Sequence, residues 1–424
     1  MPKLSDVFGV NARVPTHTYV DRASLDGKLK YLLGADRHII LFGASKQGKT
    51  SLRRKVLPDD SAIIIQCRLE ATVDSLYENL LATLGTPVPI EMERTRSQGG
   101  SATVGAKGEV GVPLVGKGQV SSEGELHTDL ETAEKFSLAN KKHSLEWIAE
   151  KVRESRRRVV IEDFHYLGEE EKRRFAFDLK TFWDLRVFTI VIGVWAEQNL
   201  LTYYNGDLAG RIEEVDLVWS DAELFQVLSL GEKSLEISFS DSLKRQIVQD
   251  AVGNVGLLQR IAERLCSNSG IFQESPGNRI TGLSALDTAR ADICREEQQR
   301  YRKFSEAVVK GYKGYDESEL KVYERIVRVC IDATDEELKH GLGSDALLKR
   351  VQAMEGRIRQ SDLSAALNRL DQLQADRKIS PLVLTYNVQE RKVFLVDREL
   401  LFFRRYGNPD WPWQRSAEAA QDPR

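Results

Sequence analysis

The chain has 424 residues, of which 41% are hydrophobic and 29% are charged, and its formal net charge at pH 7 is only -3. This length and apolar content predict about two or three folded domains. A charge so close to neutral excludes a global electrostatic attraction to nucleic acid or to anionic membranes, so any such contact would need a local basic patch.

The four cysteines are few and scattered, and neither a CxxC pair nor a histidine cluster accompanies them. They are Cys67, Cys266, Cys294 and Cys330. This pattern predicts buried thiols in the reducing cytoplasm. The first residues lack the apolar run of a signal peptide, and no stretch reaches the roughly 18 apolar residues of a membrane span, so we expect no membrane contact.

Five short apolar runs in the first half of the chain are typical of buried strands. They are rich in Ile and Val, and they cover residues 37–42, 62–67, 158–161, 187–193 and 213–218. Apolar residues recur at helical spacing in residues 76–84 and 145–152, between these runs. Because strands and helices alternate, the sequence predicts an α/β fold with a parallel sheet and right-handed crossovers.

One segment interrupts this alternation. Residues 97–125 are rich in Gly and Ser and carry no helical period, while residues 109–120 partly alternate as a strand would. We expect a mobile surface loop or hairpin inserted between the second and third strands. A subunit contact or a sensor element is the alternative.

The second half of the chain predicts two further parts. Helical patterns at residues 221–229, 241–252, 257–267 and 283–310 predict a helical lid. Three more helices, at 319–331, 345–354 and 362–375, precede strands at 382–386 and 392–396, which together predict a winged-helix domain. Ser344 and Ser361 are expected to cap the last two helices. The expected domains are therefore a core at 1–220, a lid at 221–312, a winged helix at 313–410 and a polar, frayed tail at 411–424.

A GxxxxGK[ST] motif lies between the first predicted strand and the helix that follows it. Gly43 and Gly48 let the backbone wrap closely around phosphate, because a Cβ would obstruct it. Lys49 is expected to reach the β and γ phosphates, Thr50 to bind magnesium, and Ser51 to support the start of the helix. The sequence thus predicts ATP and Mg²⁺ on a phosphate loop made of Gly43, Ala44, Ser45, Lys46, Gln47, Gly48, Lys49 and Thr50.

The third predicted strand ends in two carboxylates, Glu162 and Asp163, in the arrangement of a Walker B motif. One carboxylate at such a strand end can hold magnesium through water, and the next can orient or deprotonate the attacking water. We assign Glu162 to the metal and Asp163 to the water, with the order of the two roles left open. An ordinary acidic strand end is the alternative, and His165 just beyond is expected to pack rather than to catalyse.

These residues resemble the AAA+ superfamily, in particular its signal-transduction (STAND) branch and its origin-recognition-type initiators. The segment from Thr18 to Arg22 is similar to the motif that cradles adenine in those families, which implies nucleotide contacts by Tyr19, Val20 and Arg22. Asp21 departs from that motif, where the families have Gly. Ala23 departs likewise, where they have Glu. The likeness spans roughly residues 16–270.

The same resemblance implies two further site residues. Arg211, between the fourth and fifth strands, resembles an arginine finger that projects into a neighbouring subunit's site; a structural salt bridge is the alternative. Gly256 lies where the lid's sensor 2 residue would contact the nucleotide, although Val255 and Gly256 replace the usual Arg or Pro and Arg260 follows one turn later. The fourth strand also lacks a clear sensor 1 residue, for which Gln198 or Asn199 could substitute.

The expected function is an ATP-binding, slowly hydrolysing switch that assembles with itself and controls a separate effector protein. The resemblance suggests a bacterial antiphage setting. One alternative is a DNA-acting ATPase of initiator or transposition-helper type. Residues 315–424 carry 18 Lys and Arg against 19 Asp and Glu, so DNA binding is not favoured, although Arg391 and Lys392 would lie on the wing. Another alternative is a non-hydrolysing scaffold that uses ATP only structurally.

Overall fold

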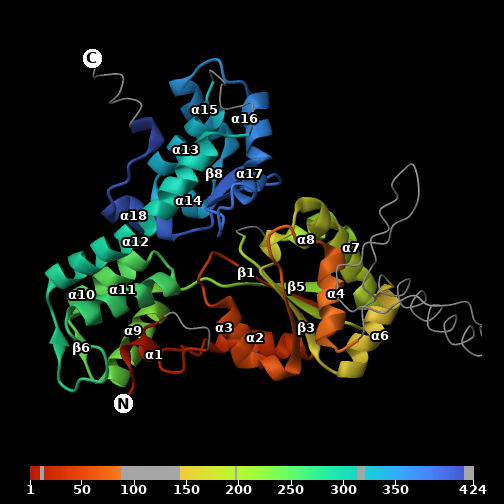
Figure 1. Ribbon diagram of the computed structural model, residues 1–424, viewed down its shortest axis with the longest axis horizontal. Coiled ribbons are helices and arrows are strands. Elements are labelled where there is room, and N and C mark those ends of the chain that lie inside the picture. Colours follow the sequence, from red (N-terminus) through yellow and green to blue (C-terminus); the bar gives the residue numbers. More distant parts are fainter. Residues whose placement is uncertain (10–13, 87–143, 196–197, 313–319, 415–424) are drawn as a thin grey trace, which may run out of the picture.

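The computed structural model describes residues 1–9, 14–86, 144–195, 198–312 and 320–414. Its centre is a five-stranded parallel sheet with the strand order β2-β3-β4-β1-β5 (Figure 1). The strands are β1 (His38–Phe42), β2 (Ala62–Gln66), β3 (Arg158–Glu162), β4 (Thr189–Ile192) and β5 (Ile212–Asp216). The predicted parallel α/β fold is therefore confirmed, whereas the predicted insert at 97–125 lies outside the described residues.

Helices cover both faces of this sheet (Figure 1). Side chains alternate along a strand, so Ile39 and Leu41 of β1 face one layer while Ile40 and Phe42 face the other. The first layer contains α2 (Ala23–Leu33) and α3 (Lys49–Val56). The second contains α4 (Val73–Thr83), α6 (Leu145–Ser155), α7 (Glu169–Asp184) and α8 (Leu200–Tyr204). We call this sheet and its two layers the sheet domain.

Helix α7 was not predicted, although its sequence carries the signal. Phe175, Ala176, Leu179 and Phe182 recur at helical spacing, and all four are buried against the sheet. The exposed face of the helix is highly charged, so the segment as a whole is polar and its apolar stripe shows only in the helical spacing.

The lid is helical, as predicted. It consists of α9 (Asp221–Leu235), α10 (Asp241–Ala251), α11 (Val255–Asn268) and α12 (Leu283–Val309), with the short paired strands β6 (Ser238–Phe239) and β7 (Arg279–Ile280). The N-terminal helix α1 (Leu4–Val7) packs against α9 and α11, so the start of the chain belongs to the lid's core.

The C-terminal module, residues 320–414, combines helices with a small antiparallel sheet of order β8-β10-β9. Its helices are α13 (Val322–Asp332), α14 (Asp335–His340), α15 (Ser344–Met354), α16 (Gln360–Leu367), α17 (Leu370–Asp376) and α18 (Glu399–Tyr406). Its strands are β8 (Leu342–Gly343), β9 (Leu384–Asn387) and β10 (Lys392–Leu395). The predicted hairpin is present, and the winged-helix assignment stays a prediction.

Two details of this module were predicted wrongly. Ser344 and Ser361 lie inside α15 and α16, and Gly343 and Arg359 occupy the N-cap positions instead. The Ser344 amide donates to the Arg391 carbonyl at the edge of β10, which draws this serine into the sheet. The single helix predicted at 362–375 is divided between α16 and α17 at residues 368–369, and both halves bury leucines in the core.

The expected frayed tail is also wrong over residues 411–414. Trp411 and Trp413 are only 4% and 8% exposed, their rings stack at 5.7 Å, and Trp411 meets Phe403 of α18 edge-on. Burial of two indoles outweighs the polar character of the neighbouring residues. The remaining tail residues, 415–424, lie outside the described part of the chain.

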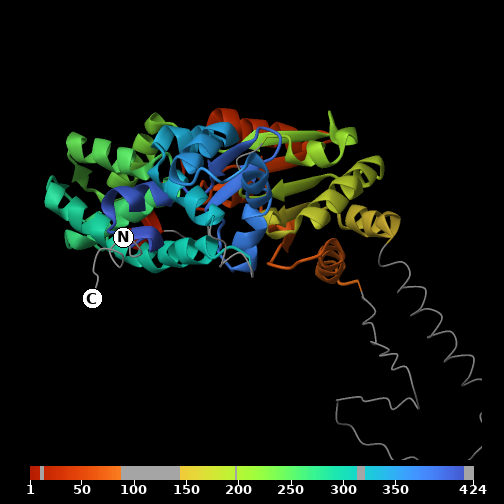
Figure 2. The ribbon, with the colours of Figure 1, turned by 90° about the horizontal axis from the view of Figure 1, so that it is seen from above.

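The lid and the C-terminal module share one continuous hydrophobic core, whereas the sheet domain has separate clusters on its two faces. Helix α12 joins the two parts, because it packs against α11 of the lid and against α13 and α18 of the module. Figure 2 shows the module, in cyan to blue, between the lid and the sheet domain in that view.

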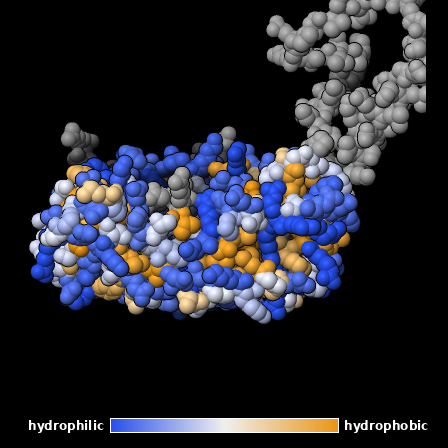
Figure 3. Space-filling model, turned by 90° about the horizontal axis from the view of Figure 1, so that it is seen from below, coloured by the Kyte–Doolittle hydropathy of each residue, from blue (hydrophilic) through white to orange (hydrophobic). Residues whose placement is uncertain are grey.

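No helix among the described residues is long and apolar enough to cross a membrane. The face in Figure 3 is a mosaic of hydrophilic and hydrophobic residues. The four cysteines are buried and unpaired, as predicted.

Candidate nucleotide-binding site

The phosphate loop connects the end of β1 to the start of α3, at the carboxyl edge of the sheet. Gly43 and Gly48 have φ values of 129° and 81°, in the region that glycine adopts without strain. A Cβ on Gly43 would also lie 3.1 Å from an oxygen of Asp216, so this position has little room for a side chain. Helix α3 begins at Lys49 with Gly48 as its N-cap, which directs the free amides of its first turn into the loop.

Lys49 is folded over the loop and is only 7% exposed. Its Nζ donates to the carbonyl oxygens of Gly43 and Ala44, at 3.0 and 2.6 Å. Burial lowers the pKa of Lys49 to about 7, although Asp163 and Asp216 act in the opposite direction. A buried ammonium that donates only to carbonyls is suited to donate to a phosphate oxygen, whose negative charge would compensate its positive charge.

This low pKa predicts proton uptake when ATP binds. Phosphate beside Lys49 raises its pKa again, so near pH 8 the empty protein carries a neutral amine and the complex an ammonium. ATP affinity should therefore fall as the pH rises from about 7 to 9, by up to about tenfold per unit. Calorimetry in buffers of different ionisation enthalpy measures the proton uptake.

The matched comparison for that titration is Lys49→Arg, because a guanidinium stays charged over the whole range. The variant should bind ATP without proton uptake. If the wild-type protein takes up no proton between pH 7 and 9, the perturbed lysine does not contact the nucleotide.

The loop forms one wall of a cavity of about 300 Å³. The structure brings the predicted adenine residues Tyr19, Val20 and Arg22 to the same cavity, together with Gly256 of the lid. Ser45 to Ser51 line it from the loop, and Asp163 lines it from the end of β3. The predicted loop, adenine and lid residues therefore meet at one place with Asp163, whereas Glu162 and Arg211 do not line this cavity.

The segment before α2 is held by polar contacts on both sides. The Tyr19 hydroxyl donates to Asp26 at 2.5 Å, and the Arg22 amide donates to the same carboxylate at 3.1 Å. The Arg22 guanidinium lies 4.1 Å from the ring of Trp219, which also lines the cavity. These contacts fix a tyrosine ring and a cation–aromatic pair beside the loop, a surface suited to a planar base.

The two predicted Walker B carboxylates have different surroundings. Glu162 accepts a hydrogen bond from Arg53 at 2.6 Å, and the Arg53 side chain is fully buried and also pairs with Asp59. Asp163 instead lines the cavity, has a left-handed φ of 57°, and accepts from Gln66 at 3.0 Å. Asp163 thus borders the nucleotide cavity, whereas Glu162 is held behind it by an arginine.

Magnesium fits this donor set. Thr50 and Asp163, a hydroxyl and a carboxylate, line the same cavity and supply the oxygen ligands that Mg²⁺ prefers. Bound there, the ion would neutralise charge on the phosphates. The assignment of Glu162 to the metal stays a prediction.

Arg211 does not lie at this cavity. Its guanidinium donates to the Asp207 carbonyl and lies 4.8 Å from the Trp183 ring. Its backbone carbonyl accepts from His38 at the amino end of β1, the edge of the sheet opposite the phosphate loop. A contact with a neighbouring subunit therefore stays a prediction.

His165, which was expected to pack, lies against Tyr166 with the two ring centres 4.1 Å apart and the rings tilted by 38°. Burial lowers its pKa to about 3, so the ring is neutral at physiological pH. Neither ring nitrogen has a hydrogen-bond partner in the described part of the chain.

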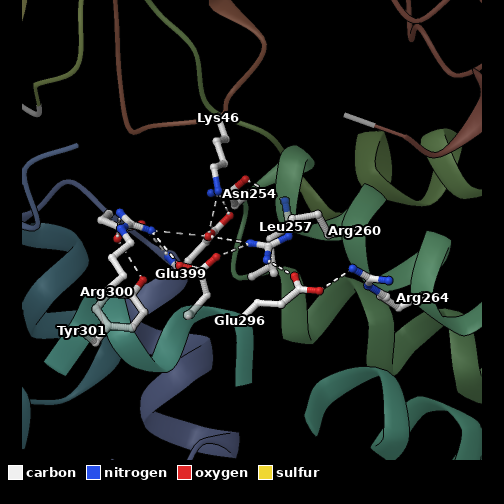
Figure 4. Close-up of polar contacts among 11 residues, drawn as sticks. Lys46, Asn254, Leu257, Arg260, Arg264, Glu296, Arg300, Tyr301 and Glu399 are labelled. Carbon is white, nitrogen blue, oxygen red and sulfur yellow. Dashed lines mark hydrogen bonds and ion pairs between the residues drawn. The ribbon is translucent and has the colours of Figure 1, made fainter. Parts of the chain in front are cut away.

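The lid and the C-terminal module both touch the phosphate loop directly, and the contact of the module was not predicted from the sequence. The Ser45 amide donates to the Val396 carbonyl at 3.2 Å, and the Lys46 ammonium lies 2.8 and 2.9 Å from the Glu399 carboxylate oxygens (Figure 4). Asn254 donates to the Ser45 carbonyl at 3.3 Å. The loop is thus held by residues more than 200 and 350 positions away in the chain.

Gly256 contacts the loop through its backbone. Its amide donates to the Lys46 carbonyl at 3.2 Å, and a Cβ at this position would lie 2.8 Å from the Lys46 Cβ. A glycine here permits the close approach of the lid to the loop.

Glu399 joins the loop to a larger network of charges (Figure 4). It is 2% exposed and accepts from Arg260 at 3.0 Å as well as from Lys46. Arg260, noted above because it follows the sensor 2 position, is also bonded to Glu296 and Glu297 at 2.9 and 2.8 Å. This network connects α11 and α12 of the lid with α18 of the module.

No protein-family model and no curated protein sequence matches the chain. Among solved structures, a Walker-type ATPase of Pyrococcus abyssi is similar over 94% of this chain and 99% of that chain, with 16% identity and a TM-score of 0.51. The Orc1 protein of Aeropyrum pernix, in complex with DNA, gives 12% identity, coverage of 94% and 95%, and a TM-score of 0.43. A STAND protein with a tetratricopeptide repeat sensor from Pyrococcus horikoshii gives 12% identity, coverage of 92% and 42%, and a TM-score of 0.37.

The strand order, the phosphate loop and the likeness to the Pyrococcus abyssi protein define the class. The chain has the fold of a P-loop ATPase of the AAA+ type, as the sequence predicted. At 16% identity this likeness concerns the fold alone.

Proposed function

We propose that this protein is an ATP-dependent molecular switch that hydrolyses ATP slowly, assembles with itself and controls a separate effector protein. The observation that carries the proposal is the contact of the phosphate loop with the C-terminal module through Val396 and Glu399. The phosphates of ATP and the C-terminal module would contact the same atoms of the loop. Binding of ATP is therefore coupled to the position of the module.

The coupling has a simple physical cause. Amides of a phosphate loop donate to phosphate oxygens, but in this structure the Ser45 amide donates to Val396. The triphosphate also attracts Lys46, which lines the cavity and is 34% exposed at its side chain. When Lys46 turns to the triphosphate, Glu399 still has its ion pair with Arg260. The buried carboxylate is therefore not left unpaired. ATP binding would therefore weaken the contacts that hold the module to the loop.

Hydrolysis would depend on few residues of this chain. Lys49 would stabilise charge on the phosphates and Asp163 would orient water, with Arg211 of one subunit completing the site of another. Arg260 forms ion pairs with three carboxylates, so this arginine of the lid is not free to contact the phosphates. This supports slow hydrolysis of ATP. A bacterial antiphage role remains the setting that the family resemblance suggests.

The DNA-acting alternative gains no support from the hairpin of the module. Arg391 lies 3.3 Å from Asp345, and Lys392 lies 3.1 Å from Glu390. Cations neutralised in this way attract phosphate weakly, because nucleic-acid binding depends on a local surplus of positive charge.

A Glu399→Gln variant tests the switch. Lys46 loses its anionic partner, so we expect ATP affinity to rise by about three- to tenfold, and the amides near residues 396–403 to exchange with solvent faster even without ATP. Titration with a fluorescent ATP analogue and hydrogen exchange measure the two effects. ATP should produce the same faster exchange in the wild-type protein.

Glu336→Gln is the matched control, since Glu336 is an exposed acid of the same module and pairs with Lys339. It should change neither affinity nor exchange. The switch is wrong if ATP binds without altering exchange near residues 396–403 and Glu399→Gln binds ATP no more tightly.

A further inference from the structure

A second cavity, of about 700 Å³, lies between the sheet domain and the C-terminal module. One wall comes from the start of α7, the residues that follow β4, and α8; the other comes from α17, β9 and the turn after β9. This volume falls within the range of about 300–1,000 Å³ that is common for ligand sites. None of the residues assigned to ATP lines it.

The cavity is lined by aromatic rings and by an excess of carboxylates. Tyr166, Trp195, Tyr203, Tyr204 and Tyr386 contribute the rings. The acids that line it are Glu70, Glu169, Asp371 and Asp376, against the cations Lys172 and Lys378.

Glu169 and Lys172 form an ion pair with each other at 2.9 Å, so their charges cancel. Three acids then face a single cation. Such a site favours a positively charged occupant that can also lie against tyrosine rings.

Asp371 is the least exposed of these four acids. It accepts from the Thr385 hydroxyl and, at 3.1 Å, from the Tyr386 amide. Burial nevertheless raises the pKa of Asp371 to about 6, in spite of these donors and of nearby Lys172. A cation placed against this carboxylate would favour its ionised form and would gain the corresponding free energy.

Exposed apolar side chains surround the same cavity. Leu69, Tyr203 and Val388 line it, and they are 40%, 54% and 54% exposed. Leu69 and Tyr203 come from the sheet domain, and Val388 comes from the module. Apolar groups gathered around a charged pocket are typical of a surface that another protein covers.

We propose that this cavity is the docking site for a segment of a partner protein that carries an arginine or lysine flanked by apolar residues. The cation lies against the tyrosine rings and faces Asp371, and its apolar neighbours cover Leu69, Tyr203 and Val388. The identification of that partner with the effector rests on the proposed function; the docking itself does not require it.

The position of the cavity also links the partner to ATP. Its two walls belong to the same two bodies that meet at the phosphate loop. A segment that binds both walls favours one arrangement of these bodies, so it must change ATP affinity, and ATP must change its affinity by the same factor.

The test selects peptides that bind the full-length protein from a phage-displayed library of random 12-residue peptides. Phage that also bind an Asp371→Asn, Tyr203→Ala double variant are removed, so that peptides bound elsewhere on the protein are discarded. The enriched peptides should share a basic residue between apolar ones. A synthetic, fluorescein-labelled member should bind about tenfold more weakly to Asp371→Asn, with Asp332→Asn as the exposed acidic control. Its affinity should fall between pH 7.5 and 5.5, because protonation removes the Asp371 charge.

Tyr203→Ala and Glu70→Gln change exposed side chains, so they test the site even if Asp371→Asn fails to fold. Enriched peptides without a cation, or equal binding to wild-type protein and to all three single variants, would overturn the proposal. Recovery of peptides that match this chain's own sequence would also overturn it, because the occupant would then be a second copy. If the wild-type protein binds the peptides but does not bind ATP, the proposed switch is refuted while the docking site stands.

Discussion

ATP binding should be lost when Lys49 is replaced by alanine. The substitution removes the one ammonium that lies inside the phosphate loop, where it bonds only to carbonyls of the loop in the empty protein. Each charge-assisted hydrogen bond contributes about 1.5–3 kcal/mol, so the loss of contacts to two phosphates should weaken ATP at least about 100-fold. Isothermal titration calorimetry measures this loss directly.

The same substitution should leave the empty protein no less stable. Burial lowers the pKa of Lys49, so the folded state resists protonation and this lysine costs stability at neutral pH. Lys30→Ala, an exposed lysine on α2, is the control for charge and should bind ATP normally. Tight ATP binding by Lys49→Ala would refute the nucleotide site, and a severe loss of stability would show that Lys49 is structural.

A second large effect is expected at Arg53, whose side chain is fully buried between Glu162 and Asp59. Arg53→Met would leave Glu162, 13% exposed, without its cation. Removal of one partner from a buried ion pair typically costs about 3–5 kcal/mol, since the other charge stays buried and unpaired. Urea denaturation followed by circular dichroism should therefore show a clearly lower free energy of unfolding.

The neighbouring residue provides the comparison. Arg54 also pairs with Asp59, at 3.4 Å, but its side chain is 30% exposed, so Arg54→Met should cost less than about 1 kcal/mol. Addition of Glu162→Gln to Arg53→Met should restore part of the loss, because the stranded charge is removed. Equal, small losses for the two arginine variants would mean that Glu162 is not held as the structure indicates.

Most of the sheet could be predicted because its signals are local. Runs such as residues 158–161 are short, apolar and bounded by polar residues, which is sufficient to identify a buried parallel strand. The phosphate loop is equally local, with eight consecutive residues between a strand and a helix. Tyr19, Val20 and Arg22 were found through a motif, and the structure brings them to the cavity of the loop.

The contacts that close the site could not be predicted, because they join distant parts of the chain. Glu399 reaches Lys46 across 353 positions, and Arg53 reaches Glu162 across 109. Neither acid has a spacing or a neighbour that indicates its partner. The caps at Ser344 and Ser361 failed for a related reason: the Arg391 carbonyl draws the first serine into the sheet, and Asp362 satisfies the amide before the second helix.

The shared core of the lid and the C-terminal module limits how this molecule can move. Because α12 is buried against helices of both parts, separating them would expose a large apolar surface. The chain connects this body to the sheet domain at two places, between α1 and α2 and between β5 and α9. The lid and the module should therefore move as one body relative to the sheet domain, so a change at Lys46 acts on the wall of the second cavity that the module supplies.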